Sequence, residues 1–141
     1  MSDAAPPAPR GPLIATKDDL LFRQVHPKYM NEGRFTPDVF LLSSSDYGLL
    51  SVSHAAKTSA EEAYHLHVKR GRASIAVVAV SVSECDEYSV PAYEDPTDDD
   101  AAHAVIDHRA FLADDKKKER RRIREMLTLK ADERGISYRP E

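Results

Sequence analysis

The feature that most restricts the fold of this chain is an apolar segment near its middle, Ser74 to Val82, with the sequence SIAVVAVSV. It is rich in β-branched residues, and a short apolar run without alternation is typical of a strand buried on both faces. We therefore predict that the segment is a strand at the centre of a sheet. Its longest apolar stretch, Ile75 to Val80, is too short to span the roughly 30 Å hydrocarbon layer of a bilayer.

Four further strands are predicted, at Leu20–Val25, Val39–Leu42, Leu49–Val52 and His103–Asp107. The first should end at His26, because Pro27 disfavours helical backbone in the residue before it. The second and third are separated by Ser43 to Asp46, whose residues favour a turn. A connection this short is typical of an antiparallel pair.

Two helices are predicted, over 60–70 and over 114–134. Ser59 and Glu62 have the spacing of a capping box, in which the serine hydroxyl accepts a hydrogen bond from the Glu62 amide. Gly71 suits the left-handed backbone conformation that follows many helices. The second helix is highly charged and carries a narrow apolar stripe that is sufficient to dock one face.

These elements predict a single α+β domain, and the length of 141 residues fits one domain. We expect a mostly antiparallel sheet of four to six strands, with the 60–70 helix packed on one face and the C-terminal helix docked beside it. Residues 1–12 contain four prolines and are predicted to be a disordered tail, so the domain spans 13–141. Residues 84–100 are predicted to form an acidic loop.

The composition indicates a cytoplasmic protein. Cys85 is the single cysteine, so the fold cannot contain an internal disulfide. The chain does not begin with a cationic segment and an apolar run, so no secretory signal is expected. We expect no contact with a membrane.

Charge is strongly segregated along the second half of the chain. Residues 84–107 contain nine acids and no Lys or Arg, whereas Lys116 to Arg124 contains seven bases and one acid. Such opposite fields suggest either an internal clasp or a surface for a partner. The candidate binding residues for a protein or a nucleic acid are Lys116, Lys117, Lys118, Arg120, Arg121, Arg122 and Arg124. No aromatic residue interrupts this run, so base stacking is not expected.

Several kinds of reactive site are not predicted by the sequence. The five glycines are isolated, so a glycine-rich phosphate loop and a bound cofactor are not expected. Ser53 and His54 are neighbours on a strand and point to opposite faces, so they cannot form a nucleophile–base pair. Cys85 lies between two acids, which disfavour its thiolate. No metal site is predicted, because the usual ligand spacing is missing among His26, His54, His65, His67, His103 and His108.

Three residues remain as weak catalytic candidates, namely Arg23, His26 and Ser51. An arginine or histidine on a first strand, a serine on a later strand and a downstream glutamate resemble the pattern of ADP-ribosyltransferase-like folds. That resemblance implies that the first group holds a dinucleotide and that the glutamate, here Glu84, orients the attacked ribose. An ion pair with one of the many acids is the alternative interpretation of Arg23.

Segments throughout residues 20–140 resemble a family of small uncharacterised bacterial proteins. They include FRQVHP from Phe22, LSV from Leu50, TSAEE from Thr58, and ADERG from Ala131 followed by YRP from Tyr138. The resemblance implies a bacterial cytoplasmic protein and no particular activity.

The sequence therefore favours a non-catalytic protein-interaction module, such as a small regulatory or accessory subunit with a protein partner. The opposed charges and the lack of an assembled catalytic set along the sequence support this hypothesis. The alternatives are a nucleic-acid-binding protein that uses the basic helix, and an ADP-ribosyltransferase-like group-transfer enzyme.

Overall fold

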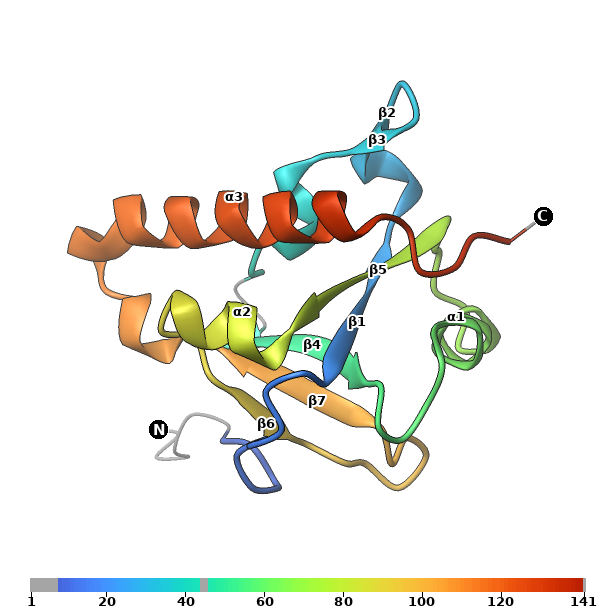
Figure 1. Cartoon of the computed structure of the whole chain (residues 1–141), viewed down its shortest axis with the longest axis horizontal. Coiled ribbons are helices and arrows are strands. Elements are labelled where there is room, and N and C mark those ends of the chain that lie inside the picture. The colour runs from blue at the N-terminus through green and yellow to red at the C-terminus, as the bar shows by residue number, and fades with distance from the viewer. Residues whose placement is uncertain (1–7, 44–45, 141) are drawn as a thin grey trace, which may run out of the picture.

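The computed structural model describes residues 8–43 and 46–140 and confirms the predicted α+β class. Its centre is a five-stranded sheet in the order β5–β1–β4–β7–β6, in which neighbouring strands are antiparallel (Figure 1). The strands are β1 (Leu20–Val25), β4 (Leu49–His54), β5 (Ala76–Ser81), β6 (Ala92–Glu94) and β7 (His103–Asp107). The α-helices of the described residues are α1 (Ala60–Lys69), α2 (Val82–Glu87) and α3 (Lys117–Arg134).

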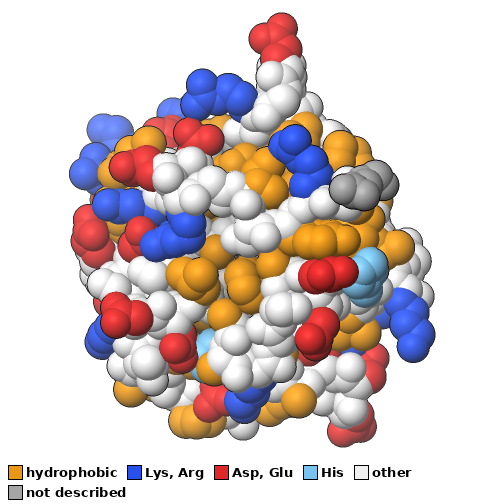
Figure 2. Space-filling model, turned by 45° about the vertical axis from the view of Figure 1, so that its right-hand side comes forward, with side chains coloured by type: hydrophobic (Ala, Val, Ile, Leu, Met, Phe, Trp, Pro, Cys, Tyr) orange, Lys and Arg blue, Asp and Glu red, His pale blue; other side chains and the backbone are white. Residues whose placement is uncertain are grey.

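A second, two-stranded sheet forms a hairpin beside the main body. Its strands are β2 (Met30–Asn31) and β3 (Arg34–Phe35), and the hairpin projects above α3 (Figures 1 and 2). Gly33 at its turn has a φ of 82°, a left-handed conformation that glycine adopts at little cost. The hairpin is tied to α3 by an exposed ion pair between Arg34 and Asp132, at 3.1 Å.

The main hydrophobic core lies between one face of the sheet and helices α2 and α3. Alternate residues of the strands point into this core because side chains in a strand alternate between its two faces. The strands contribute Leu21, Val25, Leu50, Val52, Val78, Val80, Ala104 and Ile106, and α3 contributes Ile123, Leu127 and Ala131. All of these side chains are buried.

Among the described residues, helix α1 covers part of the opposite face, where it contacts β1 and β5. Phe22, Ala60, Val77 and Ala79 form a smaller buried cluster there. Helices α1 and α3 therefore lie on opposite faces of the sheet, and the prediction that they dock side by side is wrong. The reason is that β5 is apolar on both faces, so each face needs its own cover.

The buried apolar strand is β5, and all six of its residues are buried, as predicted. Its predicted position at the centre of the sheet is wrong, since β5 lies at the edge. The chain that follows α3 covers this edge: the Val77 amide donates to the Tyr138 carbonyl at 2.8 Å, and the Ser137 amide donates to the Val77 carbonyl at 2.8 Å. An edge strand covered in this way does not need polar residues for protection.

Strands β1 and β4 separate within the sheet. Strand β1 pairs with β5 along its whole length, from Leu20 to Val25, but pairs with β4 at Leu21 and Phe22. Beyond Phe22 the hydrogen-bond ladder between β1 and β4 ends, and this separation opens the sheet next to the candidate site described below.

Two segments differ from the predicted secondary structure. Residues Pro37–Phe40 form a 3-10 helix instead of a strand, and Val39 and Phe40 are buried in the main core. An apolar run of four residues does not distinguish a strand from a buried turn of helix. Residues 84–100 form part of α2 and all of β6 instead of a loop. Ser81 and Glu84 form a capping box at the start of α2, with the Glu84 amide donating to Ser81 Oγ at 3.1 Å.

The remaining element predictions are confirmed within a few residues. Strands β1 and β7 have the predicted bounds, and the Glu62 amide donates to Ser59 Oγ at 3.1 Å at the start of α1. Of the predicted tail, residues 1–7 lie outside the described residues. Gly11 and Pro12 exchange backbone hydrogen bonds with Glu94 and are therefore part of the folded body.

Candidate functional site

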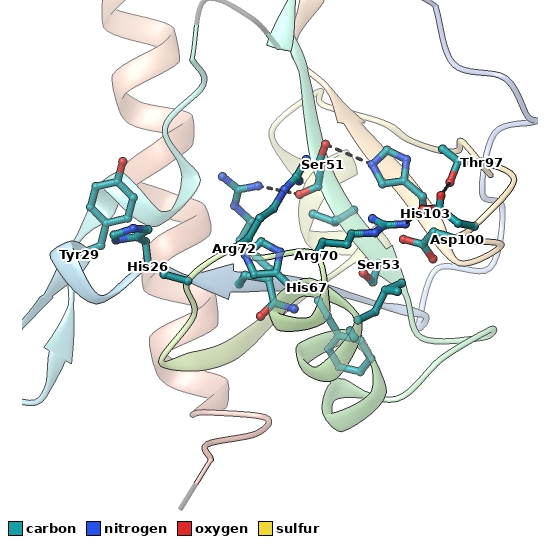
Figure 3. A pocket seen from close by; sticks show the side chains of 18 residues that line it. His26, Tyr29, Ser51, Ser53, His67, Arg70, Arg72, Thr97, Asp100 and His103 are labelled. Atoms are coloured by element: carbon teal, nitrogen blue, oxygen red, sulfur yellow. Dashed lines mark hydrogen bonds and ion pairs between the residues drawn. The ribbon is translucent and has the colours of Figure 1, made fainter.

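A polar pocket lies on the face of the sheet that α1 covers in part. Its walls come from α1, from strands β1, β4 and β7, and from the turn at 97–100, and its volume is about 920 Å³ (Figure 3). The side chains that carry its chemistry are Arg23, Ser51, His67, Arg70, Arg72 and His103. The pocket exists because α1 reaches across β1 and β5, while the α1-side faces of β4 and β7 carry Ser51, Ser53 and His103.

Arg23 fills the gap where β1 and β4 separate. Its Nε donates to the Val39 carbonyl at 2.8 Å, and its Nη1 donates to the Ser51 carbonyl at 2.8 Å. The guanidinium group thus replaces part of the missing ladder between the strands. Desolvation lowers the pKa of Arg23, and Asp46 and Tyr29 oppose this effect at longer range. No acidic side chain among the described residues forms an ion pair with this buried cation.

Positive charge converges on His67, in the last turns of α1. Burial is the main cause that lowers the pKa of His67, and a hydrogen bond to the Ala73 backbone partly opposes it. The guanidinium groups of Arg72, Arg23 and Arg70 lower the pKa further. Within the described parts of the chain, Arg72 forms no ion pair or hydrogen bond. The region around His67 therefore has a positive potential.

The acidic side of the pocket is the turn between β6 and β7. Arg70 forms an ion pair with Asp99 at 2.8 Å, and Asp99 also accepts a hydrogen bond from Thr97. The Thr97 hydroxyl is the largest cause that lowers the pKa of Asp99. Asp100 accepts from the Ala102 amide at 3.1 Å and so holds the turn in place.

Ser51, His103 and Asp95 form a line of hydrogen bonds along one side of the pocket. Ser51 Oγ lies 3.2 Å from His103 Nε2. His103 Nδ1 lies 3.0 Å from Asp95 Oδ2 and 2.9 Å from the Asp95 carbonyl oxygen. Asp95 is buried, and its other carboxylate oxygen accepts from the Arg10 amide at 2.9 Å. Figure 3 shows Ser51 and His103 facing each other across the sheet surface.

The structure brings the three weak catalytic candidates to this pocket. Arg23, His26 and Ser51 all line it, although His26 lies at the far end beside Tyr29 (Figure 3). Glu84 does not line the pocket, because its carboxylate caps α2 and accepts from Arg134 at 2.7 Å. The glutamate that the ADP-ribosyltransferase-like pattern requires is therefore not supplied by Glu84.

Two other residues considered in the sequence are occupied elsewhere. His54 is buried, and its Nε2 pairs with Asp19 at 2.7 Å. Cys85 is fully buried; burial, followed by the charges of Asp86 and Glu84, raises the pKa of its thiol. A thiol in this environment is unreactive, as predicted.

The sequence did not indicate that His67, Arg70, Arg72, His103 and Asp95 belong to one site. His67 and Arg70 are three residues apart, a spacing that places both on one face of a helix. That spacing was the one local signal available. Contact between His103 and Ser51 depends on how β4 and β7 align, which only the folded sheet determines.

The basic run lies on the N-terminal half of α3, on the opposite side of the sheet from the pocket. Lys117, Lys118, Arg121 and Arg124 surround a second hollow of about 420 Å³, with Phe40, Leu41 and Leu42 among its other lining residues. Arg120 is held inward by hydrogen bonds to the carbonyls of Phe111 and Ala113. Figure 2 shows Lys and Arg side chains at the upper left of the molecule, interspersed with acidic ones.

The predicted internal clasp between the acidic segment and the basic run is not present among the described residues. The acids of residues 84–107 pair instead with Arg10, Lys17, Lys57, Arg70, His103, Arg109 and Arg134. Within the basic run, the ion pair that the described residues form is Arg121 with Glu125, at 3.7 Å. The clasp fails because bases that are scattered along the sequence lie closer to these acids in the fold.

In residues 8–43 and 46–140, no three His, Cys, Asp or Glu side chains gather in a way that could hold a metal ion. No helix of this part of the chain has the length and apolar character needed to cross a bilayer. Comparison of the chain with protein families, with curated proteins and with solved structures finds no match.

Proposed function

We propose that the protein is a binding module whose pocket holds a small phosphorylated ligand. The observation that carries this proposal is the uncompensated positive charge of the pocket. Of its three guanidinium groups, Arg70 is paired with Asp99, Arg23 contacts two neutral carbonyls, and Arg72 has no partner among the described residues. A phosphate group matches this surplus, because guanidinium groups bind phosphate through paired, charge-assisted hydrogen bonds.

The remaining lining supports a ligand with polar groups besides the phosphate. Ser51, Thr97 and His103 offer hydroxyl and imidazole groups to the pocket. Its volume of about 920 Å³ lies in the range of roughly 300–1,000 Å³ that small-molecule sites occupy. A sugar phosphate or a mononucleotide has the size and chemistry that this lining would recognise.

Calorimetric titration with ribose 5-phosphate and with ribose tests this proposal, because the two sugars differ by the phosphate alone. We expect the phosphorylated sugar to bind at least about tenfold more tightly. Arg72→Ala should weaken its binding by about tenfold or more, since the unpaired guanidinium is lost. Arg34→Ala, on the projecting hairpin, is the matched control and should bind normally. Equal affinity for both sugars, or normal binding by Arg72→Ala, contradicts the proposal.

We propose the basic half of α3 as a second binding site, for an acidic segment of a protein partner. The bases of this half lack acidic partners among the described residues apart from the Arg121–Glu125 pair. Apolar side chains are exposed beside them, at Leu41 and at Leu112, which are 40% and 44% exposed. A protein segment that combines acidic and apolar residues fits this surface better than a nucleic acid, because bases have no aromatic side chain in the run on which to stack.

Binding to polyglutamate and to a single-stranded DNA oligonucleotide, measured at low and at high salt, separates the two partners. We expect salt-sensitive binding to polyglutamate and weaker binding to DNA. Reversing the charges of Lys117, Lys118 and Arg121 should abolish binding, whereas Lys69→Glu on α1 should not. Tighter binding to DNA would favour the nucleic-acid alternative, and binding that survives the triple reversal would exclude this surface.

A further inference from the structure

Three adjacent strands place a serine, a histidine and an aspartate in a row. Ser51 lies in the middle of β4, His103 begins β7, and Asp95 directly follows β6. The register aligns Ser53 with His103 and Glu94 with Ala104. Residues two apart on a strand share a face, so the imidazole of His103 reaches diagonally from its position opposite Ser53 to Ser51.

The hydrogen bonds of His103 define the role that each ring nitrogen can play. The carboxylate and the carbonyl oxygen of Asp95 both lie within 3.0 Å of Nδ1. Two acceptors at this position hold a proton on Nδ1, so Nε2 of the neutral ring keeps its lone pair toward Ser51 Oγ, 3.2 Å away. This is the arrangement in which a histidine acts as the general base of a serine nucleophile.

Each member of the array has the exposure that such a role requires. Asp95 is buried, with 6% of its surface exposed, and Arg10 holds it through its backbone amide and its guanidinium. The imidazole of His103 is 21% exposed, and Ser51 is exposed to the pocket. The orienting group is therefore shielded, whereas the hydroxyl is open to a ligand.

Positive charge lies next to the hydroxyl. The guanidinium group of Arg23 donates to the backbone carbonyl of Ser51 itself, at 2.8 Å. Fixed cationic donors beside a nucleophile stabilise negative charge that develops on an attacked carbonyl oxygen. The array and the phosphate-binding groups thus occupy the same pocket.

We propose that Ser51 is the nucleophile of an acyl-transfer site, with His103 as its general base and Asp95 as the residue that positions His103. The substrate class is a carboxylic ester that carries a phosphate or carboxylate group, an inference that rests on the proposed anion-binding function of the pocket. The same pocket would then bind the charged end of the ester and cleave its acyl bond.

The reaction is balanced in two steps. Ser51 Oγ attacks the ester carbonyl and its proton passes to His103 Nε2; the ester C–O bond breaks, and the alcohol leaves with that proton. Water then attacks the acyl-serine and gives a proton to His103 Nε2. The carboxylic acid leaves, and His103 returns the proton to Ser51 Oγ. No oxidant or reductant is needed.

A fluorophosphonate probe tests the nucleophile, because it reacts covalently with activated serines. Intact mass and peptide mapping should place one adduct on Ser51 of the wild-type protein. The adduct should be absent in Ser51→Ala, and its rate of formation should fall at least about 100-fold in His103→Gln. Ser83→Ala, which removes an exposed serine on α2, is the control and should label normally. A folded wild-type protein that is not labelled, or one labelled at another serine, overturns the proposal.

Hydrolysis of mono-p-nitrophenyl succinate and of p-nitrophenyl acetate tests the substrate class. We expect kcat/KM for the charged ester to be at least about tenfold higher, and Arg72→Ala to remove that preference. Asp95→Asn should lower kcat by about 100-fold or more with little change in KM, as expected of a positioning residue and not of a structural one. Equal rates in Ser51→Ala and the wild type would overturn the proposal.

The two proposals for this pocket fail in different ways. Ser51→Ala should keep its affinity for ribose 5-phosphate, because its guanidinium groups are intact. If the wild type binds this sugar phosphate but neither reacts with the probe nor cleaves either ester, the acyl-transfer proposal is wrong and the binding function stands. If Ser51 reacts but Arg72→Ala has no effect on either readout, the anionic substrate class is wrong.

Discussion

The two faces of the sheet are built from the same strands but have opposite characters. In β4, Leu50 and Val52 point into the main core, whereas Ser51 and Ser53 point to the pocket side. The face under α2 and α3 is closed and apolar, and the face under α1 is part apolar and part polar. One strand thus supplies both packing and chemistry, because its side chains alternate.

The difference between the faces follows from what covers them. Helix α3 has 18 residues and a length of about 27 Å, whereas α1 has 10 residues and a length of about 15 Å. Five strands that are about 4.8 Å apart span roughly 19 Å between the outer two. The shorter helix covers β1 and β5, and the polar surface of β4 and β7 remains for a ligand.

The largest effect is expected in the closed face. Leu127 is fully buried in the main core, so Leu127→Ala should lower the free energy of unfolding by about 2–5 kcal/mol. Leu129, on the same helix, is 47% exposed, and Leu129→Ala should cost less than about 0.5 kcal/mol. Urea denaturation followed by circular dichroism measures both. Similar losses in the two variants would show that α3 does not close this face.

The next largest effect concerns Arg23, where the two faces meet. Arg23→Met removes the donors to the Val39 and Ser51 carbonyls, and each unpaired buried acceptor costs about 1–3 kcal/mol. We expect a clear loss of stability in urea denaturation together with weaker binding of ribose 5-phosphate. Arg23→Lys should lose at least part of both, since a single ammonium cannot reproduce the planar fork. A Met variant as stable as the wild type would show that the gap between β1 and β4 needs no bridge.

A smaller effect is expected from pH, through His67 on the polar face and His108 in the buried interior. Burial is the largest cause that lowers the pKa of each. In the unfolded chain both have a pKa of about 6.5, so below that pH the unfolded state takes up protons that the folded state resists. Stability should therefore be highest above about pH 6.5 and fall on acidification, by at most about 1.4 kcal/mol per pH unit for each proton. Unfolding free energies between pH 7 and pH 5 check this, and a slope unchanged in the double variant His67→Gln, His108→Gln would contradict it.

The smallest effect is expected on the polar face itself. Ser51→Ala removes an exposed hydroxyl, so the free energy of unfolding should change by less than about 0.5 kcal/mol. Thermal unfolding of the wild type and the variant measures this. A loss above about 1 kcal/mol would mean that the Ser51–His103 hydrogen bond stabilises the fold and is not part of a site.

Local signals in the sequence predicted the elements well. Pro27 marked the end of β1, Ser59 marked the start of α1, and the bounds of β7 followed from its apolar alternation. Each of these depends on the chemistry of a few neighbouring residues. The same kind of signal was missed at Ser81 and Glu84, where the acidic composition obscured a capping box.

The arrangement of the elements, and with it the site, could not be predicted in this way. Ser51 and His103 are 52 residues apart, and they meet because β4 and β7 pair in one particular register. Arg23 lines the pocket because β1 leaves β4 after two pairs, a departure that no local pattern encodes. The edge position of β5 likewise depends on the chain near Tyr138, which covers it from a distant part of the sequence.

The central claim, that positive charge converges on His67 to hold a phosphate, is tested most directly by the pKa of His67. An NMR titration of its ring, with and without saturating pyrophosphate, measures this value in the folded protein. We predict a pKa below the ordinary value of about 6.5 in the free protein and a higher pKa when the anion is bound. An ordinary pKa that pyrophosphate leaves unchanged would contradict the claim.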